Sequence, residues 1–88
     1  MEIKIYSRFM KTREKAHAHI ARRLSFPKYY GKNLDALHDM LTERGEKTEI
    51  IIKGSERLRE SMDGYGARII EVFLDCAEEN SNITVTLK

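Results

Sequence analysis

The sequence of 88 residues has one cysteine, one proline and no tryptophan. A lone cysteine, Cys76, excludes a disulfide within the chain, and its apolar helical surroundings favour a buried hydrophobic side chain over a nucleophile. No apolar run approaches the roughly 18 residues that a membrane-spanning helix needs. The first residues lack the apolar segment of a signal peptide. We therefore expect a protein of the reducing cytoplasm that makes no contact with a membrane.

The motifs of common enzymes are also missing. The sequence contains no glycine-rich phosphate loop, no HExxH motif and no nucleophile elbow. His17 and His19 point to different sides of a helix, so they cannot hold one metal ion together. An acid-base or cation-binding set of Asp35, His38 and Asp39 is the one enzymatic alternative, and turnover lost in Asp39→Asn would reveal it. We expect no enzyme activity, no cofactor and no metal.

Charge is distributed unevenly along the chain, although its net value is only +2. Residues 1–30 hold eight of the sixteen Lys and Arg residues but two of the fourteen acids, so this part carries +6 and the remainder −4. The basic face of residues 13–23 allows nucleic-acid binding as one alternative. A run of acids follows residue 34 at short intervals: Asp35, Asp39, Glu43, Glu46 and Glu49.

Hydrophobic periodicity predicts a single α/β domain over residues 1–88. Predicted strands cover 2–6, 49–53 and 83–88, and predicted helices cover 13–24, 34–42, 56–61 and 67–79, with Thr12, Asn33 and Ser55 as N-caps and 63–66 as a breaker. The run Ile50–Ile52 is apolar throughout, as in a central parallel strand, whereas the outer strands alternate. We predict a three-stranded parallel sheet with right-handed crossovers and helices packed mainly on one face.

The segment 27–42 carries the strongest functional pattern. It begins as a loop whose two tyrosines and glycine are typical of a contact surface. In the helix that follows, Asp35 and Asp39 share one face, with His38 beside it. Two like charges at this spacing repel by a few tenths of a kcal/mol, and no Lys or Arg at i±3 or i±4 offsets Asp39. We expect both carboxylates to face water, either for a partner or as ordinary solvated residues.

The pattern Pro-x-Tyr-Tyr-Gly-x-Asn-Leu-Asp-Ala-Leu-x-Asp-x-Leu-Thr at 27–42 resembles the signature of the barstar family, intracellular inhibitors of secreted barnase-type ribonucleases. Elsewhere the similarity thins to short pieces such as 72–73 and 83–84, although the length and element order also fit. The family's compact α/β fold agrees with the predicted one. The resemblance implies a monomer that binds one ribonuclease and blocks its active site through residues 27–44.

The resemblance also implies roles for individual residues. Asp39 would be the central anion for the arginines and histidine of the nuclease, and Asp35 would pair with a neighbouring donor. Tyr29 would pack on the catalytic histidine. Gly31 and Asn33 would supply close loop contacts.

Five further residues complete the predicted contact set: Tyr30, His38, Thr42, Arg44 and Asp75. Asp75 stands where the family has a peripheral glutamate and has solvation as its alternative, while Tyr30 has core packing as its alternative. His38 and Arg44 replace tryptophans of the family, and an imidazole at this place predicts an affinity that varies between pH 5.5 and 8. An inhibitor of another toxin and an RNA-binding module remain alternative functions.

Overall fold

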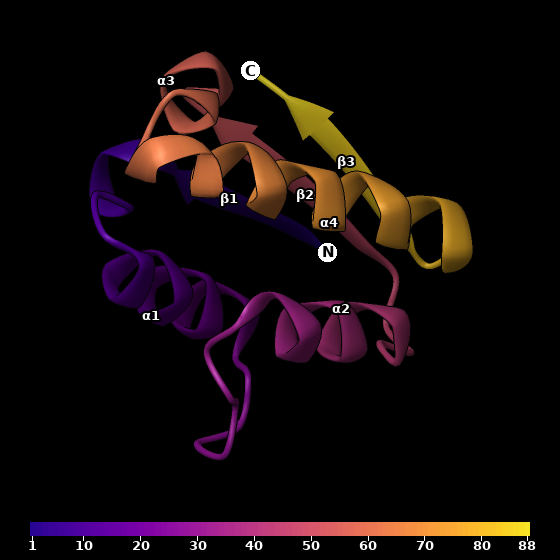
Figure 1. Cartoon of the computed structure of the whole chain (residues 1–88). Coiled ribbons are helices and arrows are strands. Elements are labelled where there is room, and N and C mark those ends of the chain that lie inside the picture. The colour runs from indigo at the N-terminus through magenta and orange to yellow at the C-terminus, as the bar shows by residue number, and fades with distance from the viewer.

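Three parallel strands form the sheet of the computed structural model, which describes residues 1–88. They are β1 (Glu2–Tyr6), β2 (Thr48–Lys53) and β3 (Ile83–Leu87), in the order β1-β2-β3 (Figure 1). The central position of β2 confirms the prediction made from its continuous apolar run. In the register of the sheet, Ile5, Ile52 and Leu87 lie side by side.

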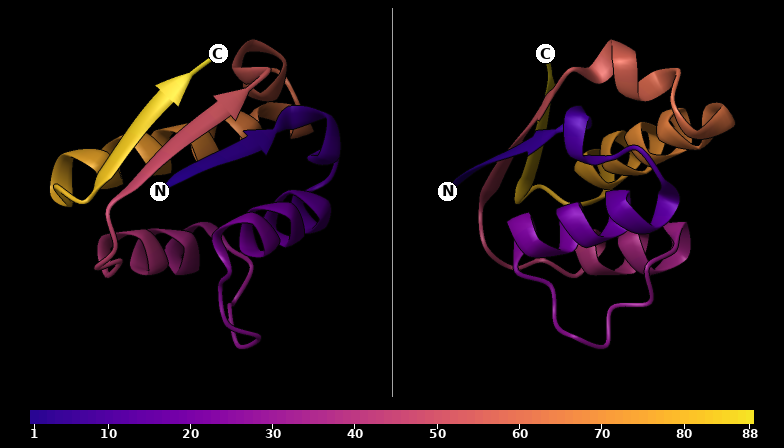
Figure 2. Two further views of the ribbon diagram at one scale, coloured as in Figure 1. Left: turned by 180° about the vertical axis from the view of Figure 1, so that it is seen from behind. Right: turned by 90° about the vertical axis from the view of Figure 1, so that its left-hand side faces the viewer.

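Four α-helices connect and cover these strands: α1 (Arg13–Leu24), α2 (Leu34–Thr42), α3 (Ser55–Arg59) and α4 (Tyr65–Glu79). Two short 3-10 turns, Ser7–Phe9 and Met62–Gly64, join β1 to α1 and α3 to α4. The right-hand panel of Figure 2 shows α1, α2 and α4 on one side of the sheet, and the left-hand panel shows the other face uncovered. The predicted α/β fold with helices mainly on one face is therefore confirmed. No helix among them combines the length and the hydrophobicity that a membrane-spanning segment requires.

The core lies between the sheet and these helices. Ile5 and Ile52 of the sheet, Ile20 of α1, Leu37 of α2 and Phe73 of α4 are all fully buried and belong to one cluster. Because α2 and α4 also pack against each other, the apolar stripe of α2 is held in place from two directions. Its opposite face is thereby presented to solvent in a defined orientation.

Two of the predicted N-caps are present as expected. The Thr12 side chain accepts from the backbone N–H of Lys15 at 3.1 Å, and the Asn33 side chain accepts from that of Ala36 at 2.7 Å. Each cap satisfies one of the N–H groups that a helix start leaves unpaired. The cap at Asn33 sets where α2 begins and therefore which of its residues face solvent.

The prediction that Ser55 is an N-cap is wrong. Gly54 takes the cap position with a left-handed φ of 75°, and Ser55 lies inside α3, where its Oγ donates to the Lys88 carbonyl at 3.4 Å. The predicted breaker at 63–66 also ends early, because α4 already includes its last two residues. Gly66 lies so close to α3 that an added Cβ would overlap the carbonyl oxygen of Leu58. Glycine at position 66 therefore allows α4 to pack closely against α3, and no turn requires it.

Candidate functional site

The loop between α1 and α2 is held by its own backbone. Ser25 ends α1 in the left-handed region with a φ of 58°, which turns the chain away from the helix axis. The N–H of Phe26 then donates to the carbonyl of Ala21 at 2.9 Å, and the N–H of Tyr30 to that of Pro27 at 3.0 Å. The loop protrudes at the bottom of Figure 1. These bonds give the protruding segment a defined shape.

The two adjacent tyrosines of this loop have opposite roles. Tyr29 is 83% exposed, whereas Tyr30 is buried with its ring 4.9 Å from that of Phe26. The Tyr30 hydroxyl hydrogen-bonds His17 Nδ1 at 2.7 Å, and His17 Nε2 hydrogen-bonds the Tyr65 hydroxyl at 2.6 Å. Tyr30 thus has the core-packing role that the sequence left open as an alternative. It anchors the loop, while Tyr29 is free for contact.

This buried Tyr30–His17–Tyr65 chain of hydrogen bonds, which we call the relay, is uncharged. Burial, with a smaller contribution from the Lys32 charge, lowers the pKa of His17, and burial raises the pKa of both tyrosines. A neutral imidazole carries one N–H, so one tyrosine accepts from the ring and the other donates to it. The relay therefore links the loop to the start of α4 without burying a charge.

The acidic face of α2 points to solvent. Leu37 and Leu41 are fully buried, so Asp35 and Asp39 lie on the outer side of the helix, where the Asp39 side chain is 73% exposed. Asp35 has no ion-pair partner, and Asp39 has only His38 Nδ1, 3.9 Å from its Oδ1. The chain's own lysines and arginines leave both carboxylates unneutralised. They are therefore available to cations from outside.

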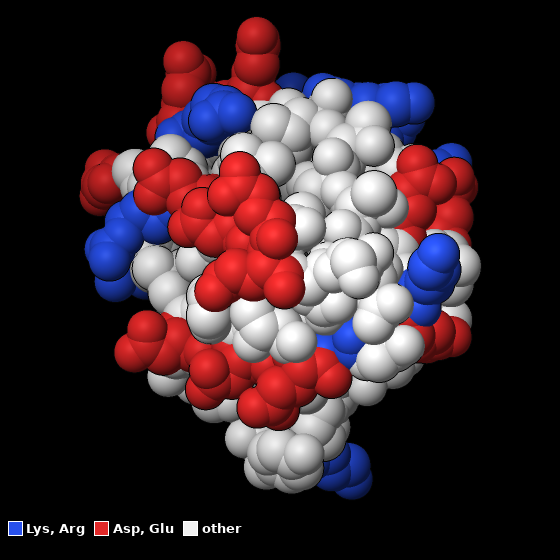
Figure 3. Space-filling view, turned by 90° about the vertical axis from the view of Figure 1, so that its right-hand side faces the viewer, with Lys and Arg blue, Asp and Glu red and all other residues white.

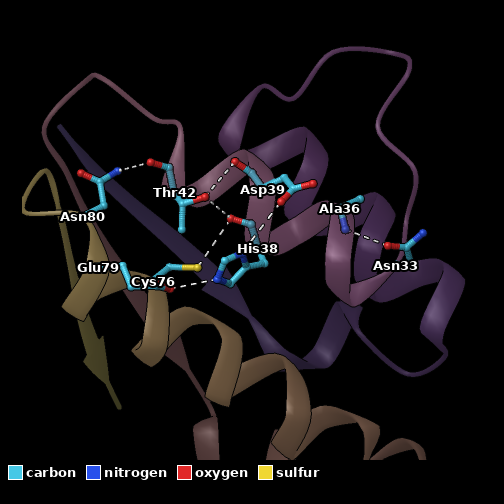
Figure 4. Close-up of polar contacts among 8 residues, drawn as sticks. All are labelled: Asn33, Ala36, His38, Asp39, Thr42, Cys76, Glu79 and Asn80. Carbon is cyan, nitrogen blue, oxygen red and sulfur yellow. Dashed lines mark hydrogen bonds and ion pairs between the residues drawn. The ribbon is translucent and has the colours of Figure 1, made fainter.

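The side chain of His38 extends from α2 to α4. Its Nε2 donates to Glu79 Oε2 at 2.9 Å (Figure 4), and its side chain remains 41% exposed. The hydrogen bond to Glu79 is the largest cause that raises the pKa of His38, and the charges of Glu79 and Asp39 act in the same direction. No local pattern could indicate this partner, because Glu79 lies 41 residues further along the chain.

Thr42 and Arg44 use their polar groups within the chain. Thr42 Oγ1 donates to the carbonyl of His38 at 2.9 Å. Arg44 Nε donates to Thr48 Oγ1 at 2.8 Å, its Nη1 donates to the Leu24 carbonyl at 3.2 Å, and its side chain is only 14% exposed. Arg44 thus joins the ends of α1 and α2 to the start of β2. Partner contact by Thr42 and Arg44 stays a prediction.

Asn80, directly after α4, is a residue of the site that sequence reasoning missed. Its side-chain amide Nδ2 donates to the carbonyls of Leu41 and Arg44, both at 2.9 Å, and to that of Thr42 at 3.3 Å. These carbonyls belong to the end of α2 and the turn after it, where helical partners are lacking. The sequence predicted only that a helix ends at residue 79, directly before Asn80, since no local pattern indicates a bond to another helix.

Acidic side chains from α2 and α4 gather on one side of the molecule. The exposed acids of α4 are Glu71, Asp75, Glu78 and Glu79. On the face that lies to the right in Figure 1, acidic side chains gather at and below the centre, and others lie toward the edges (Figure 3). Burial raises the pKa of the Cys76 thiol to about 11, and the charges of Glu79, Asp75 and Asp39 act in the same direction, so Asp75 of α4 and Asp39 of α2 lie near the same side chain. Gly31 and Asn33 are exposed at the start of α2, where a Cβ on Gly31 would lie 3.3 Å from that of Ala36.

Comparison with known proteins agrees with this architecture. Residues 1–88 match the family described as "Barstar (barnase inhibitor)". The chain is also 34% identical over 67 residues to the protein named "Putative ribonuclease inhibitor YrdF" of Bacillus subtilis (strain 168), an alignment that covers 75% of this chain and 74% of that protein. With its parallel sheet and its solvent-facing acidic helix, the chain belongs to the barstar family of barnase inhibitors.

Proposed function

We propose that this protein is a stoichiometric inhibitor of a barnase-type ribonuclease made for export, and that it protects the producing cell by occupying the nuclease active site. The observation that carries the proposal is the pair of carboxylates on α2. Asp35 and Asp39 are exposed on a capped, core-anchored helix, and no Lys or Arg of the chain pairs with them. A surface of this kind suits a cationic cleft.

The physical basis is imitation of the RNA phosphate. A ribonuclease needs Arg, Lys and His side chains to hold the phosphate and the negative charge that develops on it. Carboxylates on a preformed helix satisfy these cations and offer no bond to cleave. Since Leu37 and Leu41 already hold α2 in the core, docking costs little conformational entropy.

We propose the individual contacts that the resemblance to the barstar family implies. Asp39 is the central anion for the arginines and histidine of the nuclease, and Asp35 pairs with a neighbouring donor. The exposed ring of Tyr29 packs on the catalytic histidine. Gly31 and Asn33 supply backbone and amide contacts at the start of α2.

Asp75 adds a peripheral carboxylate from α4. The internal bonds of Tyr30, Thr42 and Arg44 favour a positioning role, in which they hold the loop and the end of α2 in the binding shape. His38 stands beside Asp39 at the edge of the contact. We also propose a monomeric free protein in the cytoplasm, where the single buried thiol of Cys76 stays reduced.

The test is a titration of a barnase-type ribonuclease with this protein, followed by RNA cleavage. Activity is expected to fall linearly and to vanish at one equivalent. Removing one partner of a buried charge pair typically costs about 2–5 kcal/mol, so Asp39→Ala is expected to weaken binding by a factor of about 30 to 4,000. The matched control is Glu60→Ala, which removes an exposed carboxylate directly after α3 and leaves binding unchanged.

Circular dichroism separates loss of binding from loss of folding. Asp39 is exposed, so its alanine variant is expected to keep the wild-type spectrum and unfolding curve. The proposal is wrong if excess wild-type protein leaves cleavage intact, or if Asp39→Ala inhibits as tightly as Glu60→Ala.

A further inference from the structure

Three potential metal ligands meet where α2 packs against α4. They are His38 of α2 and Cys76 and Glu79 of α4, and one ligand atom of each lies within 4.8 Å of the other two. His38 Nε2 and Glu79 Oε2 are 2.9 Å apart, and Cys76 Sγ donates to the His38 carbonyl at 3.7 Å (Figure 4). The three side chains converge from two helices that the core holds together.

We propose that this cluster binds a divalent transition-metal ion of the zinc type. The ligands are His38 Nε2, Cys76 Sγ and one carboxylate oxygen of Glu79, and a water molecule fills the fourth position. Imidazole, thiolate and carboxylate are the side chains that zinc uses, and three protein ligands with one open position form a known tetrahedral arrangement. The thiolate and imidazole disfavour calcium and magnesium, which prefer oxygen ligands.

The geometry requires only small movements of the side chains. Tetrahedral coordination with metal–nitrogen and metal–oxygen bonds of about 2.0–2.1 Å and a metal–sulfur bond of about 2.3 Å places the ligand atoms about 3.3–3.6 Å apart. The gap of 2.9 Å between His38 and Glu79 must therefore widen slightly, while separations of up to 4.8 Å must close by about 1 Å. Cys76 and Glu79 are three residues apart on α4, a spacing that places them on one helix face.

Two of the three ligands face solvent. The side chains of His38 and Glu79 are 41% and 54% exposed, so an ion meets them first, whereas Cys76 is fully buried. On binding, the metal–sulfur bond forms as the S–H bond breaks, and the Cys76 proton passes to solvent. The His38 ring must keep one proton, on Nδ1: an imidazolium releases its Nε2 proton to solvent, whereas a neutral ring protonated on Nε2 moves that proton to Nδ1. No oxidation or reduction is involved.

Occupation of this site would also change the acidic face. Asp39 Oδ1 lies 3.9 Å from the His38 ring. At a pH where His38 is neutral before binding, the dication displaces only the Cys76 proton, so the site gains one positive charge next to the proposed central anion. The metal-loaded protein is then expected to inhibit the ribonuclease less tightly. This consequence rests on the proposed function, whereas metal binding does not.

Titration of the folded protein with Co²⁺ tests the site directly. We expect tetrahedral visible bands and thiolate-to-cobalt charge-transfer absorption that saturate at one equivalent, and Zn²⁺ is expected to abolish both. Mutation of a residue that only hydrogen-bonds to a metal ligand typically lowers metal affinity by about tenfold or more. Because His38 and Glu79 are themselves ligands, His38→Gln and Glu79→Gln are each expected to weaken binding by at least about tenfold. The control Glu78→Gln changes an exposed neighbouring carboxylate outside the cluster and should bind as wild type.

Cys76→Ser is expected to abolish the charge-transfer band. If this buried substitution unfolds the chain, the variants of the two exposed ligands, His38→Gln and Glu79→Gln, still test the site. Absence of the band in the folded wild type, or equal affinity of Glu79→Gln and Glu78→Gln, would overturn the proposal. Ribonuclease titrations with Zn²⁺ or with chelator form a separate arm. If the protein inhibits the ribonuclease but does not bind cobalt, only the metal-site proposal is wrong. If it binds cobalt but does not inhibit, only the proposed function is wrong.

Discussion

The relay provides the most direct test of how the fold holds the loop between α1 and α2. Tyr65→Phe removes only the hydroxyl that bonds His17 Nε2 at 2.6 Å and keeps the ring, which lies 4.3 Å from the Arg13 guanidinium. Because His17 is buried, its nitrogen cannot bond to water instead. Leaving one buried polar group unpaired costs about 1–3 kcal/mol, and each kcal/mol lowers Tm by about 4–8 °C in a domain of this size.

The same reasoning applies at the other end of the relay. Tyr30→Phe removes the hydroxyl bonded to His17 Nδ1 at 2.7 Å, with a similar expected loss. Hydrogen bonds in a chain polarise one another, so each single variant also loses this mutual strengthening. The double variant Tyr30→Phe/Tyr65→Phe is therefore expected to lose less free energy of unfolding than the sum of the single variants.

Urea unfolding followed by far-UV circular dichroism measures these effects, since the chain has no tryptophan to serve as a fluorescent probe. The control is Tyr29→Phe, because Tyr29 is 83% exposed and its change should stay within about 0.5 kcal/mol. If Tyr65→Phe unfolds at the same urea concentration as Tyr29→Phe, the relay does not stabilise the fold and the reasoning is refuted.

Three further substitutions test the packing around the site. Gly66→Ala should lower the free energy of unfolding by about 1–3 kcal/mol or more, because the new Cβ would overlap the Leu58 carbonyl oxygen. Asn80→Ala leaves carbonyls at the end of α2 unpaired, so we expect a loss of about 1–3 kcal/mol and faster amide exchange in α2. The raised pKa of His38, due first to Glu79, means that its contribution to stability is full below pH 6.5 and is lost as the pH rises through the raised value. Denaturation curves of His38→Gln should therefore differ more from wild type at pH 5.5 than at pH 8.

Each of these tests has a matched control. A Cβ on Gly45 would meet no atom within 4 Å, so Gly45→Ala should be neutral or slightly stabilising. Ser81→Ala changes the exposed residue after Asn80 and should leave amide exchange in α2 unchanged. The denaturation curves of His38→Gln at the two pH values are measured in EDTA, which excludes bound metal. Besides Glu79, the titratable groups that face His38 are Asp39 and Cys76. If Gly66→Ala is as stable as Gly45→Ala, the close packing of Gly66 against Leu58 is contradicted. If the His38→Gln curves follow wild type at both pH values, the stabilising pair of His38 and Glu79 is contradicted.

Local sequence determined the elements of the fold and the direction of the acidic face. The apolar run at Ile50–Ile52 predicted the central strand, and Asn33 predicted the start of α2. Spacing alone then placed Asp35 and Asp39 opposite the buried leucines. These predictions were correct because helix caps and side-chain periodicity depend on residues within one or two turns of the chain. Ser55 was the exception, since Gly54 with its positive φ took the cap position.

Tertiary structure alone decided which side chains support that face. The pairing of His38 with Glu79, and the bonds from Asn80 to the end of α2, join residues about 40 positions apart. Only the packing of α2 against α4 brings them together. Likewise, the sequence could not say that Tyr30 is buried and Tyr29 exposed, because neighbouring residues of a loop have no fixed periodicity. Burial there depends on where His17 and Tyr65 place their polar atoms, which is a property of the assembled core.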